Sequence, residues 1–134
     1  MTEQKTSKGL HIGLWVVQVL LAAAFGMAGF MKTTAPIEQL AQGGMSFVNS
    51  YGVGMVRFIG ISELLGAIGL ILPAALRIKP ALTPLAAVGI AIIMVLACIY
   101  HISNSEPFMP ATVLLALAVF VAWGRYKKAP VLPK

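Results

Sequence analysis

Residues 56–73 read VRFIGISELLGAIGLILP, and this segment determines how the rest of the chain is interpreted. Apart from Arg57, Ser62 and Glu63, every residue in it is apolar or glycine. A long apolar run without strict alternation predicts a helix that crosses a lipid bilayer, where the backbone must satisfy its own hydrogen bonds. A carboxylate in such a helix is energetically costly, so Glu63 requires a physical explanation.

The composition of the whole chain agrees with a membrane protein. Of its 134 residues, 59% are hydrophobic and 10% are charged, whereas soluble domains average about 25% charged residues. The length predicts a single integral membrane domain over residues 1–134. Although the net charge is +6, the sequence lacks the stripe of basic residues with exposed aromatics that nucleic-acid-binding proteins carry. The expected partner is therefore the lipid bilayer and not a nucleic acid.

Four apolar segments are predicted to span the membrane as helices. Their approximate ranges are 10–31, 53–72, 82–101 and 108–123, and the last is the shortest. Prolines lie at the ends of these segments, where helices tolerate them, and Pro73 is expected to close the second one. The predicted fold class is all-α, an antiparallel four-span transmembrane helix bundle.

The distribution of lysine and arginine predicts the orientation of the bundle. With both termini inside, only Lys32 and Arg57 lie on the outer side. The bases on the inner side are Lys5, Lys8, Arg77, Lys79, Arg125, Lys127, Lys128 and Lys134. Because cytoplasmic loops are enriched in these residues, we expect an N-in, C-in topology. A cleaved signal peptide over residues 1–24 is less favoured, because the apolar run continues beyond it.

The longest connection, residues 32–52, lies on the predicted outer side. The segment PIEQLAQ at 36–42 places Ile37, Leu40 and Ala41 on one side of a short helix and polar residues on the other. This pattern is typical of an amphipathic helix on the membrane surface. We expect it to fold over the outer end of the bundle as a lid.

Glu63 is predicted to face the interior of the bundle. At about 100° per residue, Gly60, Gly66 and Ala67 share its side of the helix. Small residues mark the face at which another transmembrane helix approaches closely. The carboxylate is therefore expected to point at a neighbouring helix and not at lipid.

Three further polar residues lie near the predicted outer end of the spans, namely Lys32, Arg57 and His101. We expect them to form, together with Glu63, a cluster that opens toward the outer side. Two interpretations stay open for this cluster. Intramembrane ionisable residues mark a binding or functional site by default, and the alternative is a paired polar lock that fixes the register of the helices.

Other kinds of site are not indicated by the sequence. Cys98 is the only cysteine, so the chain has neither an internal disulfide nor a CxxC redox pair. The two histidines and four acidic residues are not spaced as metal ligands, and no dinucleotide- or phosphate-binding motif is present. The sequence therefore predicts no catalytic residue, no metal site and no resident cofactor.

The chain resembles the DoxX-like family of small four-helix bacterial membrane proteins. The motifs that carry the resemblance are GFMKTTAP at 29–36, RFIGISELLGAIGLILP at 57–73, the segment 76–102 and VAWGR at 121–125. The most specific combination is Arg57, Gly60, Glu63, Gly66, Gly69 and Pro73. The resemblance implies a multi-pass protein of the bacterial cytoplasmic (inner) membrane.

Some members of this family are tied to respiratory electron transfer involving quinones or to membrane complexes that handle oxidative stress. From the polar cluster and this resemblance together we expect a non-catalytic subunit or binding module for a small amphipathic ligand, with a quinone as the candidate. Its ligand-binding residues would be Glu63, Arg57, Lys32 and His101, and its protein partner a membrane oxidoreductase or a second copy of the chain. The alternative is a membrane scaffold or assembly factor in which the buried charges only lock the bundle. A proton-coupled carrier is a weaker option, since no inverted repeat is evident.

Overall fold

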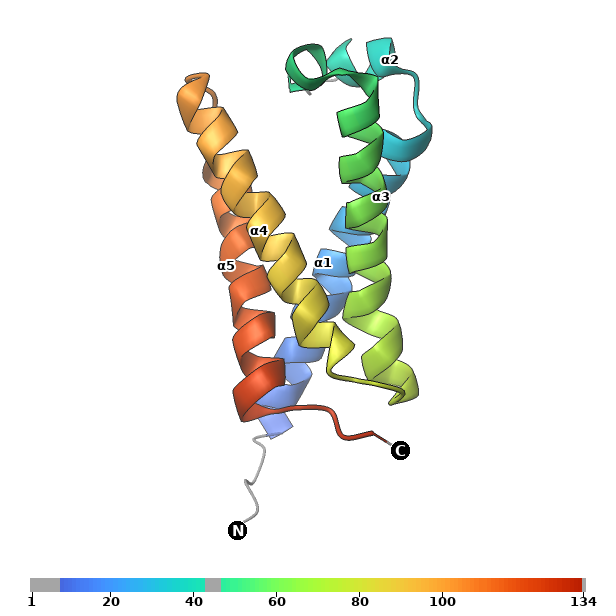
Figure 1. The fold of residues 1–134 in the computed structure, drawn as a ribbon. Coiled ribbons are helices and arrows are strands. Elements are labelled where there is room, and N and C mark those ends of the chain that lie inside the picture. The colour runs from blue at the N-terminus through green and yellow to red at the C-terminus, as the bar shows by residue number, and fades with distance from the viewer. Residues whose placement is uncertain (1–7, 43–46, 134) are drawn as a thin grey trace.

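The computed structural model of the chain describes residues 8–42 and 47–133 (Figure 1). In these residues it contains helices and no strands, which confirms the all-α prediction. The elements are α1 (Lys8–Thr34), α2 (Ile37–Gln42), α3 (Phe47–Leu76), α4 (Leu82–Ser103), α5 (Met109–Trp123) and the π-helical turn η1 (Gly124–Lys128).

Within the described residues, four helices are long and apolar enough to cross a membrane, as predicted. The sequence predicts a short fourth segment that ends near residue 123. Instead, η1 continues the helix beyond α5, so that this segment reaches 20 residues, the length that a bilayer core requires. The four segments are Lys8–Thr34, Tyr51–Leu76, Leu82–Ser103 and Met109–Lys128.

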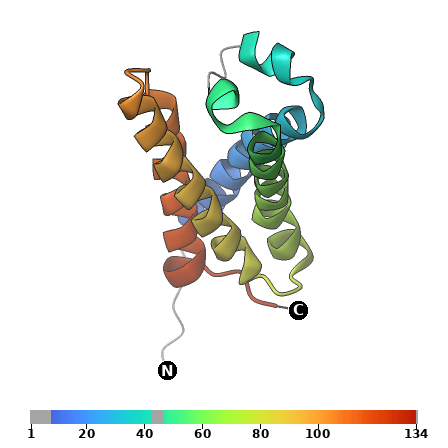
Figure 2. The ribbon, with the colours of Figure 1, turned by 45° about the horizontal axis from the view of Figure 1, so that its top comes forward.

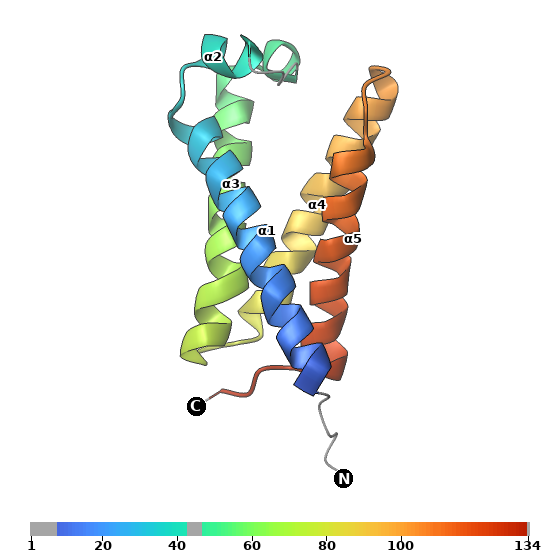
Figure 3. The ribbon, with the colours of Figure 1, turned by 180° about the vertical axis from the view of Figure 1, so that it is seen from behind.

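The helices form two pairs that meet at one end of the molecule. α1 packs along α3 and α4 packs along α5, while α3 also contacts α4. The two pairs converge at the end where α1 begins and α5 finishes, and they diverge toward the end that carries α2 (Figures 1 and 3). We call the first the basic end, because its charged side chains are Lys8, Arg77, Lys79, Arg125, Lys127 and Lys128. The second is called the α2 end.

Small residues allow the helices to approach closely, as the pattern around Glu63 predicted. A Cβ atom added to Gly29 on α1 would lie 2.7 Å from the carbonyl oxygen of Gly60 on α3. A Cβ atom on Gly66 would lie 2.9 Å from the side chain of Ile90 on α4. The contact at Gly29 is with backbone that cannot move aside, so α1 packs on α3 only with glycine there. At Gly66 a larger residue would require the side chain of Ile90 to shift.

The buried apolar side chains lie where the helices face one another. Leu21 and Phe25 from α1, Leu70 from α3 and Ile90 from α4 belong to one continuous core. Large apolar side chains on the opposite faces of the same helices are exposed. Exposed apolar side chains of this kind are expected on a surface that lipid tails cover. Together with the four long apolar helices, they identify the chain as a multi-pass membrane protein.

Pro73 lies inside α3, which corrects the prediction that it closes the second span. Proline has no N–H to donate to the carbonyl four residues earlier, which is that of Gly69. The hydroxyl of Thr83 on α4 donates to this carbonyl at 2.9 Å. Because a neighbouring helix satisfies the group that proline leaves open, α3 continues to Leu76.

The connection between α1 and α3 lies at the α2 end. Leu40 of α2 is buried against Val56 of α3, which agrees with the predicted apolar side of the short helix. Gly52 has φ 84° and kinks α3, so the residues before it turn away from the helix axis (Figure 2). The ring of Tyr51 then lies 5.6 Å from that of Tyr100 on α4. The side chain of Ala41 lies outside the described residues, and the lid stays a prediction.

Candidate functional site

Lys32 and Glu63 form an ion pair between α1 and α3. The ammonium group of Lys32 donates to Oε1 of Glu63 at 2.8 Å. The side chain of Glu63 is 1% exposed and that of Lys32 is 12% exposed. Glu63 therefore faces the bundle interior, as the sequence predicted.

The close crossing of α1 and α3 explains why this pair forms. A Cβ atom on Gly29 would lie 3.1 Å from Cβ of Glu63, and one on Gly60 would lie 2.8 Å from Cβ of Lys32. The two backbones are thus nearest where the charged residues begin, which shortens the distance that each side chain must reach. The carboxylate of Glu63 is almost fully buried at this contact. In such a poorly solvated place an ion pair offsets the cost of desolvation only when the distance and orientation of the two charges are favourable.

Arg57 contacts the same part of α1 in a different way. Its Nη1 donates to the carbonyl oxygen of Lys32 at 2.9 Å and to that of Ala35 at 2.7 Å. The last carbonyls of a helix have no partner within the helix and carry partial negative charge. Arg57 therefore caps the C-terminus of α1 from α3, and this capping was not predicted.

His101 is placed apart from the other three predicted residues. Its Nδ1 lies 2.9 Å from Oε1 of Glu106, across the turn that joins α4 to α5. Both side chains are about one-third exposed, at 32% and 29%. The structure thus brings Lys32, Arg57 and Glu63 together, whereas His101 belongs to the helix pair that diverges from them. Sequence reasoning did not single out Glu106, although its spacing from His101 across a turn was a usable signal.

A second polar group at the basic end was not predicted as a site. Arg125 is 2% exposed, and its Nε donates to Oε1 of Gln18 at 2.6 Å. Its Nη1 donates to the carbonyl oxygen of Ala129 at 2.8 Å and lies 3.0 Å from Nδ1 of His11. The amide of Gln18 in turn donates to the carbonyl oxygen of Leu70 at 2.6 Å. These bonds connect α1, α3 and η1.

The sequence predicts Arg125 to be one of the bases on the inner side of the membrane, and not a buried residue. In the structure its side chain is buried. Its guanidinium also lies 5.5 Å from the centre of the ring of Trp15, within cation–π range. Since arginine can only donate hydrogen bonds, His11 accepts through Nδ1 and carries its proton on Nε2. The sequence feature that could have indicated this buried group is Gln18, a polar residue in the middle of the first apolar segment.

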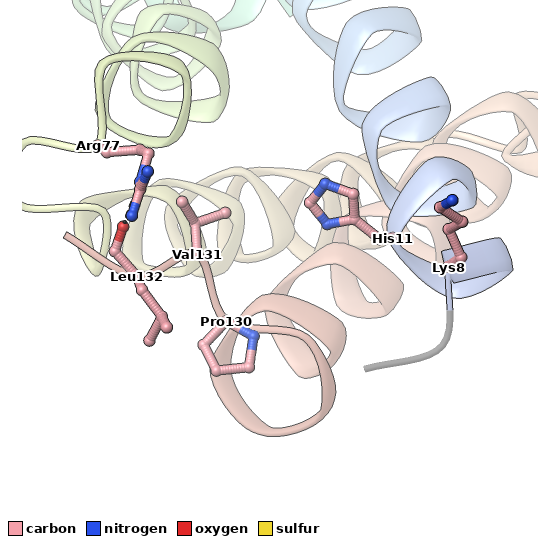
Figure 4. Close-up of a pocket in the computed structure, with 6 residues that line it drawn as sticks. All are labelled: Lys8, His11, Arg77, Pro130, Val131 and Leu132. Atoms are coloured by element: carbon pink, nitrogen blue, oxygen red, sulfur yellow. Dashed lines mark hydrogen bonds between the residues drawn. The ribbon is translucent and has the colours of Figure 1, made fainter. Parts of the chain in front are cut away.

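A groove of about 540 Å³ lies next to this group at the basic end. Figure 4 shows the C-terminal residues 130–132 between Arg77 on one side and His11 and Lys8 on the other. Nε of Arg77 donates to the carbonyl oxygen of Leu132 at 2.8 Å, which holds the segment across the end of the bundle. The lining residues are Lys8, His11, Arg77, Pro130, Val131 and Leu132.

Metal-ligating side chains are not grouped in the part of the chain that the structure describes. Among residues 8–42 and 47–133, no three His, Cys, Asp or Glu side chains lie close enough to hold a metal ion. The thiol of Cys98 lies 3.6 Å from the hydroxyl of Thr112 on α5.

Comparison with known proteins supports the resemblance seen in the sequence. A model of the DoxX-like family matches residues 16–123, which include all four predicted site residues and Gln18. The match covers the second and third membrane-spanning segments completely and most of the first and fourth. Neither the curated proteins nor the solved structures contain a significant match to the chain.

Proposed function

Because the chain belongs to the DoxX-like family of membrane proteins, we propose that it is a non-catalytic membrane scaffold or subunit. In this role the ion pair of Lys32 and Glu63 locks α1 to α3. The observation that carries the proposal is that the polar groups of the site already satisfy one another. Glu63 is paired with Lys32, and Arg57 is bonded to the end of α1.

The energetics of buried charges support a lock. Removing one partner of a buried ion pair typically costs about 3–5 kcal/mol, because the other charge is left without compensation. The pair joins two helices that cross at Gly29 and Gly60, so any sliding of α1 along α3 separates the charges. A polar pair at such a crossing specifies one register among several that apolar side chains alone would accept.

The orientation and location of the bundle are part of the proposal. Six described bases lie at the basic end, and Lys32 and Arg57 are the two described bases nearer the α2 end. By the positive-inside rule the basic end faces the cytoplasm, with both termini inside. We place the protein in the bacterial cytoplasmic membrane, where the family resemblance locates it.

A membrane oxidoreductase complex, or a second copy of the chain, is the partner that we propose. Crosslinking in native membranes, followed by purification and mass spectrometry, tests this part. Recovery of redox-complex subunits supports the first partner and a crosslinked dimer supports the second. Recovery of the monomer alone, at crosslinking that captures a known complex in the same membranes, contradicts both.

The lock is tested by a double-mutant cycle on the ion pair, read as the free energy of unfolding in detergent. Lys32→Met and Glu63→Gln are each expected to lose about 3 kcal/mol, and the double variant to lose less than the sum by at least about 1 kcal/mol. The partly exposed pair of His101 and Glu106 supplies the matched control, and Glu106→Gln should cost less than about 1 kcal/mol. Strict additivity of the two single changes at Lys32 and Glu63 contradicts the lock.

A quinone is the second candidate, and one observation favours it. Lys32 keeps 12% of its side chain exposed while Glu63 keeps 1%, so an amphipathic molecule would reach the pair from the lysine side. Lys32 would then donate a hydrogen bond to a quinone carbonyl oxygen. A short-chain ubiquinone should raise the unfolding midpoint of the wild type and of Glu106→Gln but not that of Glu63→Gln. If no quinone shifts the wild type, this second role is refuted and the lock is unaffected.

A further inference from the structure

The groove at the basic end is lined by hydrogen-bond donors from distant parts of the chain, two of which are cations. Lys8 and His11 come from the first turns of α1, and Arg77 comes from the connection after α3 (Figure 4). His11 accepts a bond from Arg125 through Nδ1, which leaves Nε2 as an N–H donor on a ring that lines the groove. Three donors therefore border one concave surface.

The charges at this end have no described carboxylate beside them. The described carboxylates are those of Glu38 on α2, Glu63 on α3 and Glu106 after α4. The nearest of them along α3 is Glu63, which precedes the helix end by 13 residues, or roughly 20 Å of helix. The basic end therefore presents uncompensated positive charge on the described residues 8–42 and 47–133.

Arg125 adds a second, independent observation. It is 2% exposed, and its hydrogen-bond acceptors are a glutamine oxygen, a histidine nitrogen and backbone carbonyls, all of them neutral. A buried guanidinium without a carboxylate is costly unless an anion lies nearby. Its position behind His11 places this charge next to the groove. It also sits in a π-helical turn, a rare conformation that is frequent at functional sites.

The rest of the lining indicates a lipid and not a free anion. Pro130, Val131 and Leu132 give the groove an apolar wall beside its cations. Trp15 lies against Arg125, and Trp123 ends α5 with Lys128 6.0 Å from its ring. Tryptophan next to lysine and arginine is typical of the membrane–water interface, and basic pockets between transmembrane helices bind anionic headgroups there.

We propose that the groove lined by Lys8, His11 and Arg77 binds the phosphate of an anionic phospholipid, with Arg125 as the buried charge behind it. The apolar residues 130–132 contact the glycerol and upper acyl carbons of the same lipid. This site lies at the opposite end of the bundle from Lys32 and Glu63, so it does not depend on the proposed lock.

The experiment is a lipid titration of the purified full chain in zwitterionic detergent, read as the midpoint of thermal unfolding. Phosphatidylglycerol, phosphatidylcholine with the same acyl chains and inorganic phosphate are added separately. Phosphatidylglycerol is expected to raise the midpoint in a saturable manner, and the other two are not. If phosphatidylcholine stabilises equally, or if inorganic phosphate reproduces the effect, an anionic-lipid site is excluded.

Two variants of equal charge separate the groove from the general basic surface. Lys8→Gln/Arg77→Gln removes two groove cations, whereas Lys79→Gln/Lys127→Gln removes two exposed bases that do not line it. Each basic residue near an anionic surface contributes a roughly fivefold factor, so the groove variant should bind phosphatidylglycerol about thirtyfold more weakly. The control variant should change by less than about threefold. Equal loss in the two variants refutes the site.

A single substitution covers the case in which loss of Arg77 disturbs the C-terminal segment that it holds. Lys8→Gln changes an exposed side chain at the start of α1 and is expected to weaken binding about fivefold. Lys79→Gln is its control. Unchanged affinity of Lys8→Gln, measured together with an unchanged unfolding midpoint in the absence of lipid, overturns the assignment of Lys8 to the site.

Discussion

The hydroxyl of Thr83 should contribute to the stability of the fold only because Pro73 interrupts the backbone hydrogen bonds of α3. Thr83 is 1% exposed and donates to the carbonyl oxygen of Gly69, the group that Pro73 cannot reach. Thr83→Val keeps the shape of the side chain and removes the donor. The carbonyl is then left without its partner between two packed helices.

The magnitude follows from the burial of this bond. A buried polar group left unsatisfied costs about 1–3 kcal/mol, whereas hydrogen bonds between membrane helices average about 0.6 kcal/mol with a maximum near 1.7. Because Thr83 is almost fully buried, we expect Thr83→Val to lower the free energy of unfolding by about 1–1.7 kcal/mol.

Pro73→Ala supplies the background that tests the reasoning. Alanine restores an N–H at position 73, which can donate to the carbonyl oxygen of Gly69 within α3. In this background the cost of Thr83→Val should fall to less than half of its value in the wild type. The assay is reversible unfolding in mixed detergent micelles, followed by circular dichroism, on all four members of the cycle.

Thr34 provides a matched control for the loss of a hydroxyl. Its Oγ1 bonds to the carbonyl oxygen of Phe30 in its own helix and is exposed, so Thr34→Val should be close to neutral. If Thr83→Val costs the same with alanine at position 73 as with proline, the hydroxyl does not serve the carbonyl that proline leaves open, and our account of α3 is wrong.

Three further substitutions test other contacts, each by the same unfolding measurement. Gly60→Ala should lose about 1–3 kcal/mol, because its Cβ would lie 2.7 Å from Thr33 Oγ1, whereas Gly54→Ala, with nothing within 4 Å, should be neutral or stabilising. Equal effects at the two glycines would contradict a close crossing. Gln18→Leu should lose about 2 kcal/mol, because it removes the acceptor of Arg125 Nε and the side-chain donor to the carbonyl of Leu70. A neutral result would mean that water replaces the amide. Arg57→Gln should lose about 1–2 kcal/mol and increase hydrogen exchange at the end of α1, since the caps on its last carbonyls are removed. Unchanged exchange there would refute the capping role.

The sequence by itself determined the class of the protein and the direction of its central carboxylate. Continuous apolar segments of bilayer length require helices, because lipid offers no partner to an open backbone. The periodicity of a helix then placed Glu63 on the side of Gly60 and Gly66, and both of these glycines are contact points in the structure. These features depend on neighbours a few residues away, so they can be read from the chain directly.

Only the tertiary structure decided which polar groups meet. Glu63 pairs with Lys32, and Arg57 bonds to backbone carbonyls. His101 at the end of α4 pairs with Glu106 in the connection to α5, away from the other three residues. The sequence indicates Arg125 as a base at the membrane interface. In the structure it is buried and donates a hydrogen bond to Gln18, which lies 107 residues earlier in the chain. Such partners depend on the crossing points and tilts of helices distant in sequence, which are set by packing at a few small residues. Helix periodicity fixes the side on which a residue lies but not the helix that arrives there.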